Sequence, residues 1–149
     1  HHDSVQPRYL SNWTLDGVNR RYSDRYRGFS LFVSAKNTHF DESRSFAELI
    51  GRALTTLTLT PTLHHAEQIK GESRPLLDDS LGIYRYDDLV VLKGTAMPAV
   101  LLEAGVILHR EEELLISSTA YRQGIGRAIV SAVGDFCKEK AFGSGTRNP

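Results

Sequence analysis

The sequence predicts an α/β domain, with a twisted sheet that is mainly parallel or mixed and helices on both of its faces. Short apolar runs that contain valine, of the kind that form buried strands, occur at 29–34, 89–92 and 99–102. Two longer segments, 41–57 and 119–140, repeat their apolar residues with a helical period. Because strands alternate with amphipathic helices, a layered arrangement is the expected fold.

The length, charge balance and cysteine content of the chain exclude several classes of function. The chain has 149 residues, enough for one domain with a real core. Lys and Arg (18) balance Asp and Glu (18), so no net field attracts nucleic acid or anionic lipid. No apolar run approaches the ~20 residues that span a bilayer. The single cysteine, Cys137, excludes an internal disulfide and a cysteine-rich zinc site. It lies on the apolar stripe of the last helix, which favours a core position over a nucleophile.

The first third of the chain starts with a polar and aromatic segment, 1–28, which is expected to be a long surface segment. Its cluster Arg20, Arg21, Arg25 and Arg27 could contact an anionic glycan peptide, although an exposed charge run is usually only solvated. Residues 29–34 (FSLFVS) predict a strand. The helix predicted over 41–57 could be capped by Thr38 or Asp41.

The middle of the chain is harder to assign. Residues 62–66 are expected to form a short strand after Pro61. Glycines and a proline among charges predict a long irregular loop over 67–88, and loops of that length often carry function. The runs 89–92 and 99–102 are predicted as buried strands.

The last third predicts two helices, over 110–116 and 119–140. Three glutamates near the start of the first complement the positive end of its dipole. Gly124-Ile125-Gly126 falls inside the second helix and is therefore no nucleotide fingerprint. The residues up to 142 are expected to form one domain, followed by a disordered tail over 143–149.

Glu103 is the strongest candidate for chemistry. It directly follows the apolar run 99–102 and precedes Ala104-Gly105. A carboxylate at the exit of a buried strand is held rigidly and partly desolvated, which suits a general base. Ligand crevices in open α/β sheets also form at strand ends. An ordinary exposed glutamate at a strand end is an equally good explanation of its position alone.

His65, Glu67 and Arg74 are candidates for the rim of a substrate site, and Glu72 lies near them in sequence. His64-His65 lacks the two-histidine helical spacing of a metalloprotease. Neighbouring residues of a strand point to opposite faces, so at most one histidine is expected to face a site. A polar strand end with solvated histidines is the plainer interpretation.

The segment around Glu103 resembles the zinc-dependent N-acetylmuramoyl-L-alanine amidases. Met97 to Glu103 reads MPAVLLE, and the family has a strand of the type MPAVLVE that delivers an active-site glutamate. Gly105 and the acidic run 111–113 follow as in the family. Residues 89–93 (LVVLK) resemble its YVLK strand, and 121–129 resemble its closing helix.

The start of the chain is also similar to this family. His1-His2-Asp3-Ser4 resembles its SIHHDS motif, cut before the histidine that binds zinc, and 28–34 resembles the strand that follows. The resemblance implies that His1 is a zinc ligand. A histidine-tag remnant is the alternative origin of His1-His2. Three departures are Ala104, Val106 and His109, where the family has Thr, Phe and an Asn helix cap.

The resemblance implies zinc-dependent hydrolysis of the amide between N-acetylmuramic acid and L-alanine of peptidoglycan. It implies that Glu103 is the catalytic carboxylate, Zn²⁺ the cofactor, peptidoglycan or muropeptides the ligands, and the periplasm or cell wall the location. A regulatory protein is a candidate partner. The family's other zinc ligands belong to the first half of its domain. We therefore expect a C-terminal part of a catalytic domain that lacks the first strands and binds zinc weakly alone.

Two other functions fit the same residues. A degenerate amidase-like module would only bind the cell wall or a protein partner, and the identity of the upstream ligand residues would separate it from an enzyme. A different metallohydrolase acting on another amide is the weaker alternative, which the mass of the products would reveal.

Overall fold

The computed structural model describes residues 5–143 and is built on a four-stranded mixed sheet. The strands lie in the order β4 (Leu76–Asp78), β5 (Ile83–Arg85), β3 (Ser30–Val33) and β6 (Leu101–Glu103). β3 runs parallel to β5 and antiparallel to β6, and β4 runs antiparallel to β5. The predicted α/β class with a mixed sheet is confirmed.

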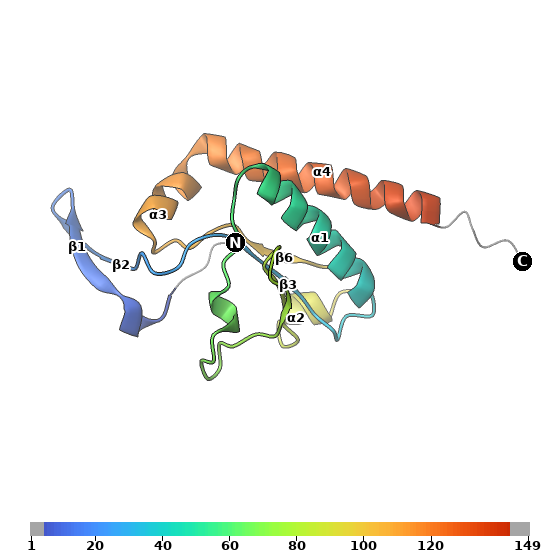
Figure 1. Cartoon of the computed structure of the whole chain (residues 1–149), viewed down its shortest axis with the longest axis horizontal. Helices are drawn as coiled ribbons and strands as arrows, with labels where there is room; N and C mark the ends of the chain where they lie inside the picture. The colour runs from blue at the N-terminus through green and yellow to red at the C-terminus, as the bar shows by residue number, and fades with distance from the viewer. Residues whose placement is uncertain (1–4, 144–149) are drawn as a thin grey trace, which may run out of the picture.

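One face of the sheet carries the two long helices, α1 (Phe40–Thr56) and α4 (Thr119–Gly143). They lie side by side over the strands (Figure 1). Alternate strand residues point toward them, as the period of two requires. The core on this face includes Leu31, Val33 and Ile83 from the strands. The helices contribute Ala47, Ile50, Leu54, Ile125, Ala128 and Ala132.

The opposite face holds a smaller aromatic cluster. Phe32 and Tyr84, from β3 and β5, are buried there with Leu92. Leu92 belongs to α2 (Val90–Lys93), a single turn on the side of the sheet away from α1 and α4 (Figure 1). The 3₁₀ turn η2 (His64–Ala66) packs against the same cluster through Ala66. Short elements thus leave part of this face open to a cavity.

A hairpin of β1 (Ser11–Leu15) and β2 (Val18–Tyr22) projects beside α3 (Arg110–Ser117), after the 3₁₀ turn η1 (Pro7–Tyr9) (Figure 1). Its two-residue loop has positive φ at Asp16 (51°) and Gly17 (76°). This is the type I′ geometry that Asp-Gly favours between strands. The prediction of an irregular surface segment over 1–28 is therefore wrong for 11–22. The Asp-Gly pair was the sequence signal that indicated this hairpin.

Three assignments in the middle of the chain are also wrong. The predicted loop over 67–88 contains β4 and β5, and β5 is a central strand. The predicted strand over 89–92 is instead the helical turn α2, with Val90 69% and Val91 67% exposed. The predicted strand over 62–66 is replaced by a single bridge between Phe29 and Pro61 and by η2. Segments of three or four residues are too short to show a period.

The remaining elements agree with the sequence except at their ends. β3, α1, α3 and α4 occur where they were expected, and the last strand, β6, is a partly buried edge strand. The N-cap of α1 is His39, so neither Thr38 nor Asp41 caps it. Gly143, expected to begin a disordered tail, is the last residue of α4, and 144–149 lie outside the described residues.

The helices also bear on the expectations for Cys137 and for membrane-spanning segments. Cys137 is exposed on α4, so the expected core position is wrong. Its turn lies beyond Ala132, the last buried residue on that helix that the structure describes. None of the helices in the described part of the chain is long and apolar enough to cross a membrane.

Candidate functional site

Glu103 ends the edge strand β6 and faces the aromatic side of the sheet. Its Cα pairs with that of Ser30 in β3. Glu103 follows Leu101 by two residues and therefore points to the same face, where Leu101 packs against the Phe32 and Tyr84 cluster. Only 12% of its side chain is exposed. The partly desolvated carboxylate that the sequence predicted is present at this position.

The two histidines of η2 are brought to the same place by a buried tyrosine. Tyr84 is fully buried, and its hydroxyl donates a 2.8 Å hydrogen bond to the carbonyl oxygen of Thr62, just before the turn. The Thr62 hydroxyl in turn contacts Nδ1 of His64 at 2.7 Å. The His64 and His65 rings lie 4.0 Å apart between centroids. Because the turn is 3₁₀ rather than extended, both rings line one cavity, and the expected opposite orientation is wrong.

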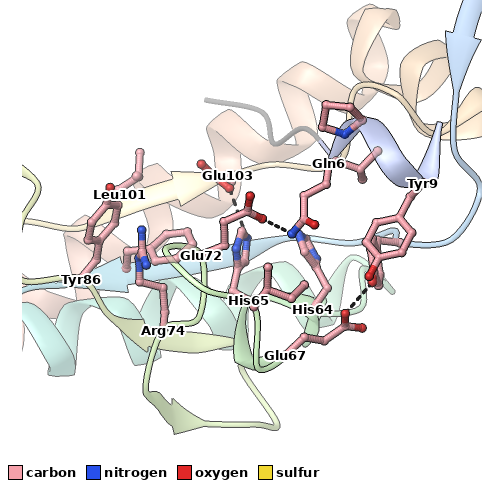
Figure 2. Close-up of a pocket in the computed structure, with 15 residues that line it drawn as sticks. Gln6, Tyr9, His64, His65, Glu67, Glu72, Arg74, Tyr86, Leu101 and Glu103 are labelled. Atoms are coloured by element: carbon pink, nitrogen blue, oxygen red, sulfur yellow. Dashed lines mark hydrogen bonds and ion pairs between the residues drawn. The ribbon is translucent and has the colours of Figure 1, made fainter.

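His65 approaches Glu103 directly. Its Nε2 lies 3.5 Å from Oε2 of Glu103, and only 15% of its side chain is exposed (Figure 2). Phe32 and Tyr84 meet the imidazole edge-on, with centroids at 5.0 and 5.4 Å. The packed rings fix the position of His65, so its spacing from Glu103 is set by the core.

A cavity of about 340 Å³ surrounds this pair. His64, His65 and Glu103 occupy its middle in Figure 2, Arg74 and Tyr86 lie toward one end, and Tyr9 toward the other. This size and the mixture of aromatic and polar walls are typical of a small-ligand site.

One end of the cavity is an aromatic and charged network around Tyr26. The Tyr26 ring stacks on His64 with centroids 4.6 Å apart, and its hydroxyl donates a 2.7 Å hydrogen bond to Glu67. Burial, followed by the Glu67 carboxylate, raises the pKa of Tyr26 to about 12. Arg25 lies over both tyrosine rings of this end, Tyr9 and Tyr26, and 3.8 Å from Glu67. The tyrosine therefore stays protonated and remains a hydrogen-bond donor at neutral pH.

The other end contains Arg74 and Tyr86. The guanidinium of Arg74 lies 4.1 Å from the Tyr86 ring centroid. The backbone N–H of Arg74 donates to the carbonyl of His65 at 2.7 Å. Glu72, exposed on the same loop, accepts a hydrogen bond from Gln6. The loop that carries Arg74 is thereby joined to the turn that carries His65.

The fold brings together most of the side chains singled out from the sequence. Glu103, His65, Glu67 and Arg74 all line the cavity. His1 lies outside the described residues, so its role as a zinc ligand stays a prediction. The arginine cluster is used differently. Arg20, Arg25 and Arg27 pair with Glu113, Glu67 and Glu111 respectively.

Sequence reasoning missed the tyrosines of the site. Tyr26 and Tyr84 are far apart in the chain, and neither belongs to a recognisable motif. Ile83-Tyr84 between Gly82 and Arg85 was a weak strand signal. Gly82 has a φ of 61°, and a Cβ there would lie 2.6 Å from Cβ of Pro61. This close approach couples β5 to the segment before η2.

His109 shows the effect of one departure from the family pattern. As N-cap of α3 it accepts from the backbone N–H of Glu111 at 3.3 Å and of Glu112 at 3.4 Å. These distances are long for hydrogen bonds, as expected for a poorer cap than asparagine. Glu112 strengthens the junction, because its carboxylate accepts from the backbone N–H groups of Gly28 and Val106, each at 2.7 Å.

The donor chemistry at the cavity agrees with a metal ligand set only in part. Imidazole nitrogen and carboxylate oxygen are donors that zinc accepts, and His64, His65 and Glu103 supply both kinds. Within residues 5–143, however, no three His, Cys, Asp or Glu side chains are grouped so that they could hold a metal ion.

Relatives of the chain among curated proteins and solved structures include amidases. It is 46% identical over 44 residues to N-acetylmuramoyl-L-alanine amidase AmiA of Salmonella typhimurium, which covers 30% of this chain and 15% of that protein. The crystal structure of the amidase Ami1 from Mycobacterium smegmatis aligns with a TM-score of 0.60 at 23% identity, over 76% of this chain and 48% of that one. The CwlD amidase of Clostridioides difficile, solved with the GerS lipoprotein, gives 0.56 at 19%, over 78% and 49%.

These similarities differ in what they establish. At under 25% identity the solved structures establish the fold alone, and the chain spans about half of their length. The family assignment rests on sequence, because the family model described as N-acetylmuramoyl-L-alanine amidase matches residues 15–135. That range includes the cavity residues from Tyr26 to Glu103. The chain therefore belongs to the N-acetylmuramoyl-L-alanine amidase family.

Proposed function

We propose that this chain forms part of an enzyme that hydrolyses the amide bond between N-acetylmuramic acid and L-alanine in peptidoglycan. The proposal rests above all on Glu103, a carboxylate that is only 12% exposed and lies 3.5 Å from His65 in the wall of the cavity. Such a group can exchange a proton with a bound ligand while bulk water is largely excluded. Family membership supplies the class of bond that is cleaved.

We assign the proton transfers to Glu103. Its carboxylate accepts a proton from the attacking water and returns it to the leaving amine of L-alanine. His65 holds that carboxylate in place, since its ring is packed between Phe32 and Tyr84. The Tyr26 and Arg74 ends of the cavity bind the two parts of the substrate, the N-acetylmuramic acid and the stem peptide, that lie on either side of the amide.

Zinc is the cofactor that we propose, with His1 as the ligand from this chain and further ligands from sequence upstream of it. When bound, the ion supplies Lewis-acid polarisation of the amide carbonyl and acidifies water. On this proposal the chain by itself binds zinc weakly and cleaves little substrate. The parent enzyme would act in the periplasm or at the cell wall, where a regulatory protein could control it.

The test is Glu103→Gln in a protein that carries this domain with its upstream residues. Glutamine keeps the size of the side chain but cannot accept the proton, so hydrolysis of purified peptidoglycan should fall at least about 100-fold. Metal analysis should show an unchanged zinc content. Mass spectrometry of the products identifies the bond that is cleaved.

Retained turnover in Glu103→Gln would refute the catalytic assignment. Products cut at another amide would point to a different metallohydrolase. Binding to peptidoglycan without any cleavage by the unmodified protein would instead support a non-catalytic wall-binding module. Glu113→Gln, which alters a half-buried glutamate paired with Arg20 away from the cavity, is the matched control and should keep full activity.

A further inference from the structure

Arg74 is the only arginine or lysine among the described residues that line the cavity. Its side chain is half-buried and is held on two sides. The Tyr86 ring supports the guanidinium, with a distance of 4.1 Å from Cζ to the ring centroid. Nη1 donates to the carbonyl oxygens of Gly71 at 3.1 Å and Ser73 at 3.0 Å. These contacts fix both the plane and the direction of the guanidinium.

The opposite edge of this guanidinium has no acceptor among the residues that the structure describes. Nε and Nη2 of Arg74 make no hydrogen bond, and no carboxylate lies within ion-pair distance, anywhere in residues 5–143. The Nε and Nη2 edge of arginine is the one that suits two parallel hydrogen bonds to a carboxylate. A half-buried cation with its preferred edge unused indicates an anion site.

The carboxylates at the other positions of the cavity are already engaged. Glu67 accepts from the Tyr26 hydroxyl and lies 3.8 Å from Arg25. Glu72 accepts from Gln6. The Arg74 end is therefore the place where the cavity can receive an additional negative charge, because no carboxylate in the described part of the chain neutralises its cation.

We propose that Arg74 binds the free α-carboxylate of the D-glutamate in the stem peptide and so sets the scissile amide in register with Glu103. This inference rests on the proposed amidase function. Arg74 is well placed for the task, because its backbone N–H donates to His65 at 2.7 Å and His65 contacts Glu103. One loop thus connects the anchor for the substrate to the group that transfers the proton. Arg74 is a specificity-determining residue on this assignment.

Two soluble ligands that differ in one group test the assignment. N-acetylmuramoyl-L-alanyl-D-glutamate carries a free α-carboxylate, and the matched isoglutamine compound carries a carboxamide there. Calorimetry measures the affinity of the unmodified protein for each, and mass spectrometry of the same samples shows whether the amide is cleaved. The carboxylate compound should bind about fivefold more tightly, as expected for a partly exposed charge-assisted pair.

Arg74→Gln should bring the ratio of the two affinities close to one. Arg74→Lys should leave a smaller preference, because lysine keeps the charge without the planar fork. Arg52→Gln is the matched control, since Arg52 is an exposed arginine of α1 paired with Glu48, and it should leave the ratio unchanged. A folding defect would reduce the apparent binding of both compounds equally and would not change the ratio of their affinities.

Equal affinities in the unmodified protein, no binding of either compound, or a preference that survives Arg74→Gln would overturn the assignment. Loss of the preference in Arg25→Gln instead would place the carboxylate at the Tyr26 end and would also overturn it. A preference that depends on Arg74 without any cleavage would support the anion site and count against the proposed amidase function. The two proposals therefore fail in different ways.

Discussion

The hydroxyl of Tyr84 lies 2.8 Å from the carbonyl oxygen of Thr62, which joins a central strand to the turn that carries His64 and His65. Tyr84 is fully buried, and its ring also contacts His65 edge-on at 5.4 Å. The position of the candidate site thus depends on one buried phenol. The stability of the fold and the geometry of the cavity are therefore coupled.

Tyr84→Phe should lower the free energy of unfolding by about 1–2 kcal/mol, because the buried Thr62 carbonyl loses its donor while the ring still fills the core. Urea unfolding followed by circular dichroism measures this. Tyr86→Phe is the control. Its hydroxyl makes no hydrogen bond within residues 5–143, so its effect should stay under about 0.5 kcal/mol. Equal effects of the two changes would contradict the role of Tyr84.

His65→Ala should reduce the turnover number of the complete enzyme between about tenfold and 100-fold with little change in KM, because Glu103 would lose the group that positions it. Steady-state assays on soluble muropeptides separate the two constants. His65→Gln should recover part of the loss, since its amide can still reach the carboxylate. A purely structural role for His65 would predict lower stability with an unchanged turnover number in the folded fraction.

Glu112→Ala should lower the free energy of unfolding by about 2–4 kcal/mol, because the backbone N–H groups of Gly28 and Val106 would be buried without an acceptor. Glu112 is only 8% exposed. Glu113→Ala, one residue away, removes only a surface pair with Arg20 and should cost less than about 1 kcal/mol. Chemical denaturation of both variants measures the difference, and similar losses would rule out the bridging role of Glu112.

Stability should decrease in alkaline solution in a way that depends on Tyr121. Burial, with the nearby Glu112 charge, raises the pKa of Tyr121 to about 12 from 10.0. The folded state favours the protonated phenol, so this contribution is complete below pH 10 and is lost as the pH rises toward 12.

Urea unfolding at a series of pH values above neutrality should show a smaller alkaline loss in Tyr121→Phe than in the unmodified protein. Part of the loss should remain, because the pKa of Tyr26 is also about 12. An identical pH dependence in the variant and the unmodified protein would show that Tyr121 titrates normally. Its hydroxyl, 2.5 Å from the carbonyl oxygen of Ala104, is the contact at stake.

The long helices were predictable because each contains several repeats of the helical period of apolar residues. The segment 41–57 carries several helical periods of apolar residues, and α1 spans Phe40–Thr56. The short central strand β5 gave no such signal, since Ile83-Tyr84-Arg85 allows only one alternation. The strand predicted over 89–92 was wrong for the same reason, because four apolar residues fit a strand or a single helical turn equally well.

The sequence by itself determined the family and the α/β class and singled out Glu103 as a candidate, because these depend on residues that are neighbours in the chain. Only the tertiary structure decided which groups meet that carboxylate. Parallel pairing of β3 with β5 brings Tyr84 under the turn at Thr62, and that turn places His65 3.5 Å from Glu103. Contacts between distant segments are set by packing in three dimensions, and no local pattern of residues records them.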